Sequence, residues 1–439
     1  MPTVTVPGSS GGTLTYTFGT GAGFSVAQQI QNALAAAATV GTVSVTSSTG
    51  VIPTVTTVGG TTQELLLTGN PTTSVPAGYN FVVNDTASPS TITAAAGTVI
   101  LSSTGGGLFA ESGAATIAAA GGNNVISQSG AGAIQLEGGS GANTITGGGT
   151  SGTIAGGTGT NMITATGTGV TILSQGTDTI ASGGSGNLVI GTTVAGSGTL
   201  SVNVTGTNNT ILGGASATTV NATASTRFYA GSGNLTFVGG TTGTATILGG
   251  TGTDSINAGS GGVIFADNTA NNATVNSGSG SATIFGAAGT SIDLIGSSNQ
   301  TEYMIAGAGN ETLNASGTTS PDFIAMGVAS VSAVMIGGSG NDTLVAGGGA
   351  GSATMTGGGG SDTFVFFKQA AGGAKDVITD FNSNDTIYME GYGAGSAAAL
   401  LQAATAGSGG LTLTLSDGTN VTFSNLTSSS SLTGKIQYG

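Results

Sequence analysis

A short repeat most strongly limits what this chain can fold into. From about residue 113, glycine-rich turns alternate with runs of about three β-branched or apolar residues. The central apolar residues of these runs recur from Ile117 to Phe364 at a mean spacing of about 9.5 residues. Three units follow one another without a gap: GGSGANTIT (138–146), GGGTSGTIA (147–155) and GGTGTNMIT (156–164). Since this period is too short for a helical repeat, it predicts very short strands.

Strands this short become stable only when they stack. Isolated three-residue strands are not stable in water. If each strand pairs with the strand two units later, parallel ladders form at a spacing of about 4.8 Å. We therefore predict an all-β chain whose residues 111–368 form a parallel β-roll or β-solenoid, with two sheets around a thin core. A flexible Gly/Ser/Thr linker array is the alternative, but a linker has no reason to space apolar residues regularly.

The two flanks differ from the repeat. Residues 1–110 predict a β-rich N-terminal module, because TVTV and TLTYTF alternate as strands do. One helix is expected near 25–38, with Ser25 as its N-cap and with one apolar face formed by Val26, Ile30, Ala33 and Leu34. Residues 369–439 predict a C-terminal cap, with a short helix in 397–406 and a closing hairpin in LTLTLSDGTNVTF.

The composition excludes several functions. The chain has 4 basic and 18 acidic residues and a net charge of −14, so it lacks the cations that neutralise a phosphate backbone and we expect no nucleic-acid partner. It has no His and no Cys, which removes the usual zinc and copper ligands and any triad that requires them.

The chain also lacks membrane and leader signals. No stretch of 18 apolar residues is present, so we expect no membrane insertion. The first residues, MPTVTVPGSSGG, lack a basic region and an apolar core, so they do not predict a Sec-type signal peptide. If the protein is secreted, its export signal is expected elsewhere.

An acidic column is expected near the C-terminus. Glu302, Asp322, Asp342 and Asp362 each lie two positions before a core residue and are spaced 20 residues apart. They should line one edge of the roll, where each like-charge pair costs on the order of 3 kcal/mol at an effective dielectric near 20. No Lys or Arg is near in sequence. A hard cation with oxygen ligands, Ca²⁺, would resolve this repulsion.

Two turns carry a complete motif around this column. GGSGNDTLV (337–345) and GGGGSDTFV (357–365) resemble the calcium-binding RTX (repeats-in-toxin) nonapeptide family, whose pattern is GGxGxDxUx with U a large apolar residue. The resemblance implies that Asp342 and Asp362 bind Ca²⁺ together with carbonyl groups around four glycines, namely Gly338, Gly340, Gly357 and Gly359. GGTGTDSIN (249–257) also matches, but the neighbours of Asp254 on that edge lack the acid.

The resemblance continues downstream and is strong over about 335–439. DVITDFNSNDTIYM (376–389) looks like the segment that follows the repeats in RTX proteins. It implies that Asp376, Asp380 and Asp385 either end the calcium column or bind a further ion. It also implies export by the type I secretion machinery through an uncleaved C-terminal signal.

The sequence is compatible with functions of three classes. We favour a self-assembling extracellular structural protein at the bacterial cell surface, such as a fibre, an S-layer-like component or a biofilm-matrix component. Its subunits, copies of this chain, would join head to tail by strand complementation. The alternative is a calcium-dependent RTX adhesin that binds a polysaccharide or another surface ligand. The threonines of this chain do not recur at a constant spacing, which disfavours an ice-binding face. We expect no enzyme, because an HExxH site is impossible without His.

Overall fold

The fold is described from a computed structural model. The described residues are 3–7, 12–17, 22–40, 42–49, 51–55, 59–69, 72–103, 105–192, 194–196, 198–268, 272–287, 290–296, 300–327, 330–347, 351–368, 370, 373–393 and 397–439. Two compact units divide the chain, Met1–Val220 (unit 1) and Asn221–Gly439 (unit 2). Strand β21 (Thr218–Ala222) contains the boundary.

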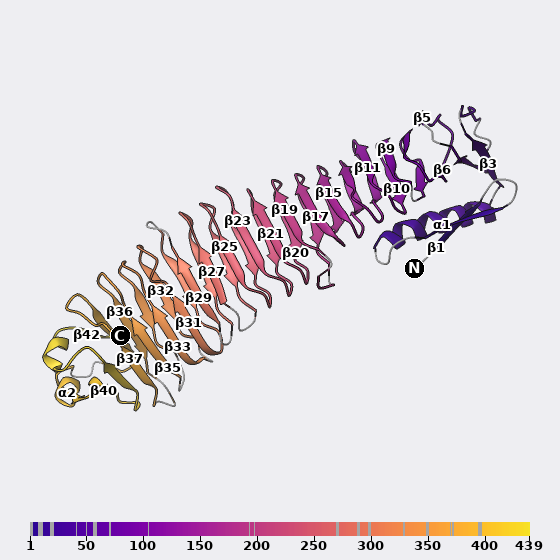
Figure 1. The fold of residues 1–439 in the computed structure, drawn as a ribbon. Coiled ribbons are helices and arrows are strands. Elements are labelled where there is room, and N and C mark those ends of the chain that lie inside the picture. The colour runs from indigo at the N-terminus through magenta and orange to yellow at the C-terminus, as the bar shows by residue number, and fades with distance from the viewer. Residues whose placement is uncertain are drawn as a thin grey trace. The chain divides into compact units, whose positions relative to one another are not determined.

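Each unit is a parallel β-solenoid with two sheets, here called sheet B and sheet C (Figure 1). The chain alternates between the sheets, so that each strand pairs in parallel with the strand one coil later. This is the predicted pairing of each unit with the second unit after it. The predicted all-β solenoid is therefore confirmed.

Unit 1 contributes strands to both sheets. Those of sheet B are β3 (Thr42–Ser48), β4 (Thr61–Leu67), β6 (Phe81–Asn84), β8 (Val99–Ser102), β10 (Ala115–Ala119), β12 (Ala133–Glu137), β14 (Ser151–Ala155), β16 (Val170–Leu173), β18 (Leu188–Ile190) and β20 (Asn209–Leu212). Those of sheet C are β5 (Thr72–Ser74), β7 (Ser90–Ala94), β9 (Gly107–Ser112), β11 (Asn124–Ser129), β13 (Thr144–Gly147), β15 (Thr160–Ala165), β17 (Thr177–Ser182) and β19 (Leu200–Val204).

Unit 2 continues the same alternation. Its strands in sheet B are β22 (Thr226–Tyr229), β24 (Ala245–Leu248), β26 (Val263–Ala266), β28 (Ala282–Phe285), β30 (Glu302–Ile305), β32 (Asp322–Ala325), β34 (Thr343–Val345), β36 (Thr363–Phe367), β38 (Thr386–Glu390) and β42 (Ile436–Tyr438). Its strands in sheet C are β23 (Leu235–Gly239), β25 (Asp254–Asn257), β27 (Asn272–Asn276), β29 (Ser291–Ile295), β31 (Gly309–Asn314), β33 (Ser330–Ile336), β35 (Ser352–Thr356), β37 (Lys375–Ile378), β39 (Thr405–Gly407), β40 (Gly410–Thr414) and β41 (Asn420–Phe423).

The core consists of in-register columns of apolar side chains. In unit 1, for example, Ile154, Ile172 and Val189 follow one another along sheet B and are fully buried. Nearly all the apolar residues predicted for the core are buried, and the two exceptions are Tyr229 and Ile264. Their neighbours Phe228 and Phe265 occupy the core instead. Because successive strand residues face opposite sides, an error of one position exchanges core and surface.

The N-terminal segment begins with a hairpin and a helix. Strands β1 (Thr3–Pro7) and β2 (Thr13–Thr17) pair antiparallel. Helix α1 (Ala22–Val40) starts before Ser25, so the predicted N-cap is wrong. Ile30 and Leu34 are buried as predicted, whereas Ala33 is exposed. The side chain of Val26 lies outside the described residues.

Helix α1 covers the outer face of sheet B in unit 1. It contacts β3, β8, β10 and β12, and Ile30 and Leu34 share a buried cluster with Leu66, Phe81 and Leu101. The parallel ladder therefore already includes residues of the expected N-terminal module, since β3 pairs with β4 and β8 with β10. The expected division into three domains stays a prediction.

The C-terminal residues close unit 2. Helix α2 (Ala397–Gln402) occupies the first part of the expected helical segment. The predicted hairpin is confirmed, because β40 pairs antiparallel with β41, which pairs in parallel with β37. A 3₁₀ turn (Ser429–Leu432) precedes β42, the last strand of sheet B. Phe381 packs against Phe364 and Phe423, with ring centroids 6.0 and 5.3 Å apart.

Candidate calcium site

The predicted acidic residues lie in one column along sheet B of unit 2. Glu302 is in register with Asp322. The pairing of Phe323 with Thr343 and of Thr343 with Thr363 places Asp342 and Asp362 next in the same column. The expected alignment is therefore confirmed, although whether these residues bind a metal remains a prediction. Asp385 continues the column, because Thr386 pairs with Thr363.

Three aspartates of this acidic column, Asp342, Asp362 and Asp385, each accept a backbone hydrogen bond from the coil before them. The Asp322 amide donates to Asp342 Oδ1 at 2.8 Å, and the Asp342 amide donates to Asp362 Oδ1 at 2.9 Å. The Asp362 amide donates to Asp385 Oδ1 at 3.0 Å. All five acids of the column are buried. One oxygen of each of three carboxylates is thus held in a fixed position between coils.

Two carboxylate oxygens in the column lack a hydrogen-bond donor among the described residues. They are Asp322 Oδ1 and Asp362 Oδ2. The other oxygen of Asp322 accepts from the Thr318 hydroxyl, and Ser277 donates in the same way to Glu302. The sequence analysis did not identify these two hydroxyl donors. Burying a carboxylate oxygen without a hydrogen-bond donor costs free energy. A cation bound at these oxygens would therefore stabilise the fold most.

Burial raises the pKa values of these carboxyl groups. The pKa of Asp322 rises to about 7, first through desolvation and then through the charges of Asp342 and Glu302. Desolvation, followed by the charges of Asp342, Asp385 and Asp380, raises the pKa of Asp362 to about 7. Near neutral pH the column therefore needs either protons or a counter-charge.

The glycine-rich turns bring a carbonyl oxygen to the same place. A Cβ atom at Gly337 would collide with both Asp342 Oδ2 and the Gly357 carbonyl oxygen, so both oxygens border the space beside Gly337. A Cβ atom at Gly357 would likewise collide with Asp362 Oδ2. Any residue other than glycine would fill this space. The carboxylates thus face a small cradle in the turn.

The other predicted glycines lie on the same edge. The Gly359 amide donates to the Gly338 carbonyl at 2.9 Å, and the Gly338 amide donates to Asp342 Oδ2 at 2.8 Å. The Gly340 carbonyl oxygen lies against Gly360 of the next coil. The carbonyl of Gly338 therefore accepts from a backbone donor, whereas that of Gly357 borders the same space beside Gly337 as Asp342 Oδ2.

The downstream acids also bind backbone amides of the preceding coil. Both oxygens of Asp380 accept, from the amides of Gly357 and Gly358, at 2.8 Å each. Asp376 accepts from the Ala353 amide at 2.8 Å. Asp376 lies in sheet C, on a different edge from Asp385. Asp385 is thus the downstream acid that extends the column.

The donor set suits a hard cation. The oxygens that border the cradle, Asp342 Oδ2, Asp362 Oδ2 and the Gly357 carbonyl oxygen, are of the kinds that Ca²⁺ prefers. Among the described residues no three acidic side chains converge on one point. A calcium ion here would therefore be shared by carboxylates of successive coils and by turn carbonyls. Bound calcium would supply a counter-charge to the acidic column.

Asp254 has a neighbour that the sequence analysis missed. A Cβ atom at Gly249 would lie 2.7 Å from Asp254 Oδ2 and 3.0 Å from Asp267 Oδ1. Asp267 comes from the next coil of sheet B and not from the edge column considered in the sequence. Desolvation, together with the charge of Asp267, raises the pKa of Asp254 to about 6.

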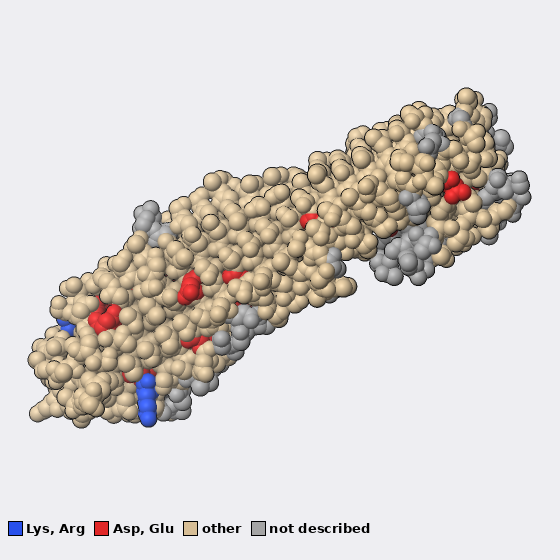
Figure 2. Space-filling model, in the orientation of Figure 1, with Lys and Arg blue, Asp and Glu red and all other residues tan. Residues whose placement is uncertain are grey.

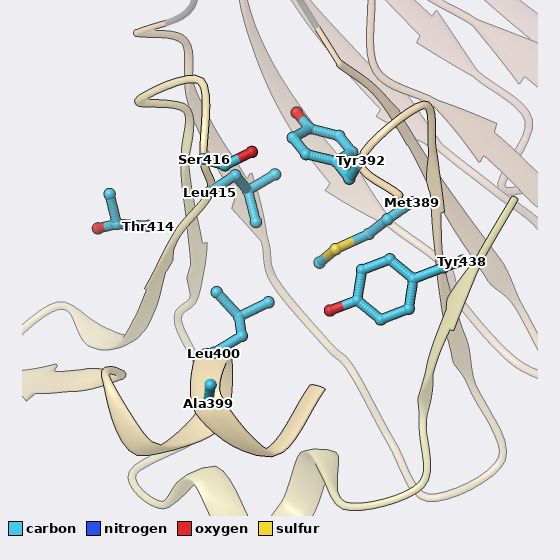
Figure 3. Close-up of a pocket in the computed structure, with 8 residues that line it drawn as sticks. All are labelled: Met389, Tyr392, Ala399, Leu400, Thr414, Leu415, Ser416 and Tyr438. Atoms are coloured by element: carbon cyan, nitrogen blue, oxygen red, sulfur yellow. The ribbon is translucent and has the colours of Figure 1, made fainter. Parts of the chain in front are cut away.

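A separate pocket of about 320 Å³ lies at the C-terminal end of unit 2 (Figure 3). Its walls include Met389, Leu400 and Leu415, with the rings of Tyr392 and Tyr438 at one side. The Tyr392 hydroxyl donates to Asp417 Oδ2 at 2.8 Å. The pocket is mainly apolar and lies apart from the acidic column.

Fold and site together define a parallel β-solenoid with a carboxylate-lined edge. A family model described as Peptidase M10 serralysin C terminal matches residues 310–430. This match covers most of the acidic column and the C-terminal closure, and it agrees with an RTX-type β-roll. Comparisons with curated proteins and with solved structures found no match. No helix among the described residues has the length and apolar character needed to cross a membrane.

Proposed function

We propose that this protein is a calcium-stabilised, self-assembling structural component of the bacterial cell surface, secreted by the type I machinery. The observation that carries the calcium part is the buried acidic column, in which the carboxylates of successive coils line one edge beside a turn carbonyl oxygen. The family match over residues 310–430 supports both calcium binding and secretion. Calcium would join successive coils of unit 2.

The assembly part rests on the ends of the ladders. Within the described residues, β3 is the first strand of sheet B and its register is given with β4 alone, so its other edge is open. An open edge is a template for a strand from another molecule. At the other end, sheet B finishes with β42. Contact between one copy's β42 end and another copy's β3 end would be heterologous and would extend indefinitely.

The surface suits close packing. On the face drawn in Figure 2, acidic and basic side chains are few and scattered. Only 5% of the residues are charged. Copies of the chain would therefore meet with little charge repulsion.

Electron microscopy of the purified protein with and without millimolar calcium tests the proposal. We expect filaments or sheets with calcium and fewer without it. Ser47→Lys, on the exposed side of β3, should block assembly, because edge lysines oppose strand addition. Thr144→Lys, on an exposed position inside the stack, is the matched control and should still assemble. A folded protein that stays monomeric at every calcium concentration refutes assembly.

An adhesin is the second candidate, favoured by an exposed apolar strip on sheet B of unit 2. Tyr229 is in register with Leu248, and Phe285 follows in the same column. Each of the three is more than a third exposed. Tyr303 and Phe323 lie on the same face, with their ring centroids 6.0 Å apart. Aromatic side chains of this kind stack on sugars. Binding to immobilised polysaccharide that Tyr303→Ala abolishes would support adhesion, whereas no binding would refute it.

A further inference from the structure

The asparagine turns of unit 1 resemble the aspartate turns of unit 2 in sequence. GGSGAN (138–143) and GGSGND (337–342) share their first four residues and differ at the fifth, Ala142 against Asn341, and at the sixth, where Asn143 corresponds to Asp342. Asn124, Asn143 and Asn161 form a column in sheet C, because Val125 pairs with Thr144 and Thr144 pairs with Met162. Asp178 follows Asn161 in the same column.

One oxygen makes the same hydrogen bond in both kinds of turn. The Asn124 amide donates to Asn143 Oδ1 at 3.0 Å, just as the Asp322 amide donates to Asp342 Oδ1 at 2.8 Å. The Asn143 amide donates to Asn161 Oδ1 at 3.2 Å. The backbone and the first side-chain oxygen therefore do not distinguish the two turns.

The second side-chain atom does distinguish them. Asn143 Nδ2 donates to the Gly156 carbonyl at 3.1 Å and to the Gly141 carbonyl at 3.2 Å. Asn161 Nδ2 donates to the carbonyls of Gly157 and Gly159 at 3.2 and 3.3 Å. In unit 2 the atom equivalent to Asn143 Nδ2 is Asp342 Oδ2, which accepts from the Gly338 amide at 2.8 Å. A Cβ atom at Gly337 would collide with both Asp342 Oδ2 and the Gly357 carbonyl oxygen. The turn of unit 1 thus has a donor beside this carbonyl, and the turn of unit 2 has an acceptor there.

The pattern recurs on the other edge of unit 1. Asn187 Nδ2 donates to the Gly167 carbonyl at 3.1 Å, and Asn209 Nδ2 donates to the Gly184 carbonyl at 3.0 Å. Where an aspartate follows an asparagine, the amide also satisfies the carboxylate: Asn161 Nδ2 donates to Asp178 Oδ1 at 2.7 Å. Side-chain amides thus bind turn carbonyls and a carboxylate in unit 1.

We infer that the side-chain amides of Asn124, Asn143 and Asn161 take the place of the cation between coils of unit 1. Calcium dependence is then confined to coils in which aspartate follows aspartate, and the sixth turn residue decides it. This inference rests on the calcium role proposed for unit 2. It assigns to unit 1 a turn of the same shape that needs no metal.

Hydrogen exchange of the full-length protein, with and without calcium, tests the inference. In the wild type, calcium removal should abolish amide protection in 322–365 and leave 124–165 unchanged. Asn143→Asp with Asn161→Asp should make 124–165 calcium-dependent and should add at least one bound ion in a calcium titration. Asn123→Asp with Asn208→Asp adds the same charge at exposed turn positions and should change neither result.

The outcomes separate the two proposals. If calcium removal exposes 124–165 of the wild type as well as 322–365, this inference alone is overturned. If 322–365 do not respond to calcium, the proposed calcium role fails and the inference fails with it. Should the first double variant not fold, Asp342→Asn with Asp362→Asn provides the reciprocal test. That variant should keep 342–365 protected without calcium, and loss of protection there would contradict the inference.

Discussion

At the scale of single residues, side-chain alternation along each strand decides which groups are buried. Phe265 is fully buried, while its neighbour Ile264 is 41% exposed. The sequence offered two adjacent apolar residues at this point, and a mean period of nine to ten residues cannot choose between them. The choice depends on the exact length of the turn before the strand.

Truncation of these two residues should therefore have unequal effects. Phe265→Ala should destabilise unit 2 by about 3–5 kcal/mol, because it leaves a cavity in the core. Ile264→Ala should change the stability by less than about 1 kcal/mol. Denaturant unfolding of both variants in calcium checks this. Equal losses would contradict the assigned register.

Glu137 should make the stability of unit 1 depend on pH. Burial raises its pKa from the ordinary 4.5 to about 8. Between these values the folded state holds a proton that the unfolded state releases, so stability is full below pH 4.5 and is lost as the pH rises through 8. One pKa unit corresponds to about 1.4 kcal/mol, so the loss is on the order of a few kcal/mol.

Thermal unfolding of unit 1 from mildly acidic to mildly alkaline pH measures this effect. Glu137→Gln should flatten the pH dependence and should exceed the wild type in stability at alkaline pH. The exposed Asp293 provides a matched carboxyl-to-amide control, Asp293→Asn, which should leave the profile unchanged. A profile that Glu137→Gln does not alter would contradict the assigned burial.

At the scale of elements, helix α1 shows how the same sheet face is used differently in each unit. In unit 1 the outer face of sheet B lies under α1, whereas in unit 2 that face carries exposed apolar side chains. The sequence predicted the helix from its amphipathic pattern. It did not predict the position of the helix, because that depends on outward-facing residues of strands far along the chain.

Detaching α1 should expose this face. Ile30→Asp places a charge in the buried cluster, and we expect a loss of stability of several kcal/mol. Hydrogen exchange should increase in α1, while the strands beneath it remain protected by their own ladders. Gln29→Asp, at an exposed position of the same helix, should have little effect. Unchanged protection of α1 in the Ile30 variant would contradict its packing.

The candidate site could be predicted in part, because the repeat motif fixes the acids but not the conformation of the turns. A spacing of 20 residues placed Glu302, Asp322, Asp342 and Asp362 on one edge, since the motif fixes the residue before each strand. Thr318 lies in the turn directly before Asp322, and Asp267 comes from the next coil after Asp254; neither position belongs to the repeat motif, so both escaped prediction. Such contacts depend on turn conformation, which a linear motif does not encode.

At the scale of the whole molecule, the two units should respond differently to calcium. Removal of calcium should unfold unit 2 at a lower temperature than unit 1, because unit 2 contains the acidic column. Asp342→Ala with Asp362→Ala should reproduce this effect even in calcium. Calorimetry with and without chelator detects it as separate transitions. A single transition that neither chelator nor the double variant shifts would count against a calcium-joined unit.

The most direct measurement is an experimental structure of the protein in millimolar calcium. We predict an ion between the turns 337–342 and 357–362, with oxygen ligands at about 2.3–2.6 Å that include carboxylates of the column. Well-ordered turns without an ion, in which Asp322, Asp342 and Asp362 keep only hydrogen-bonded partners, would contradict the calcium role.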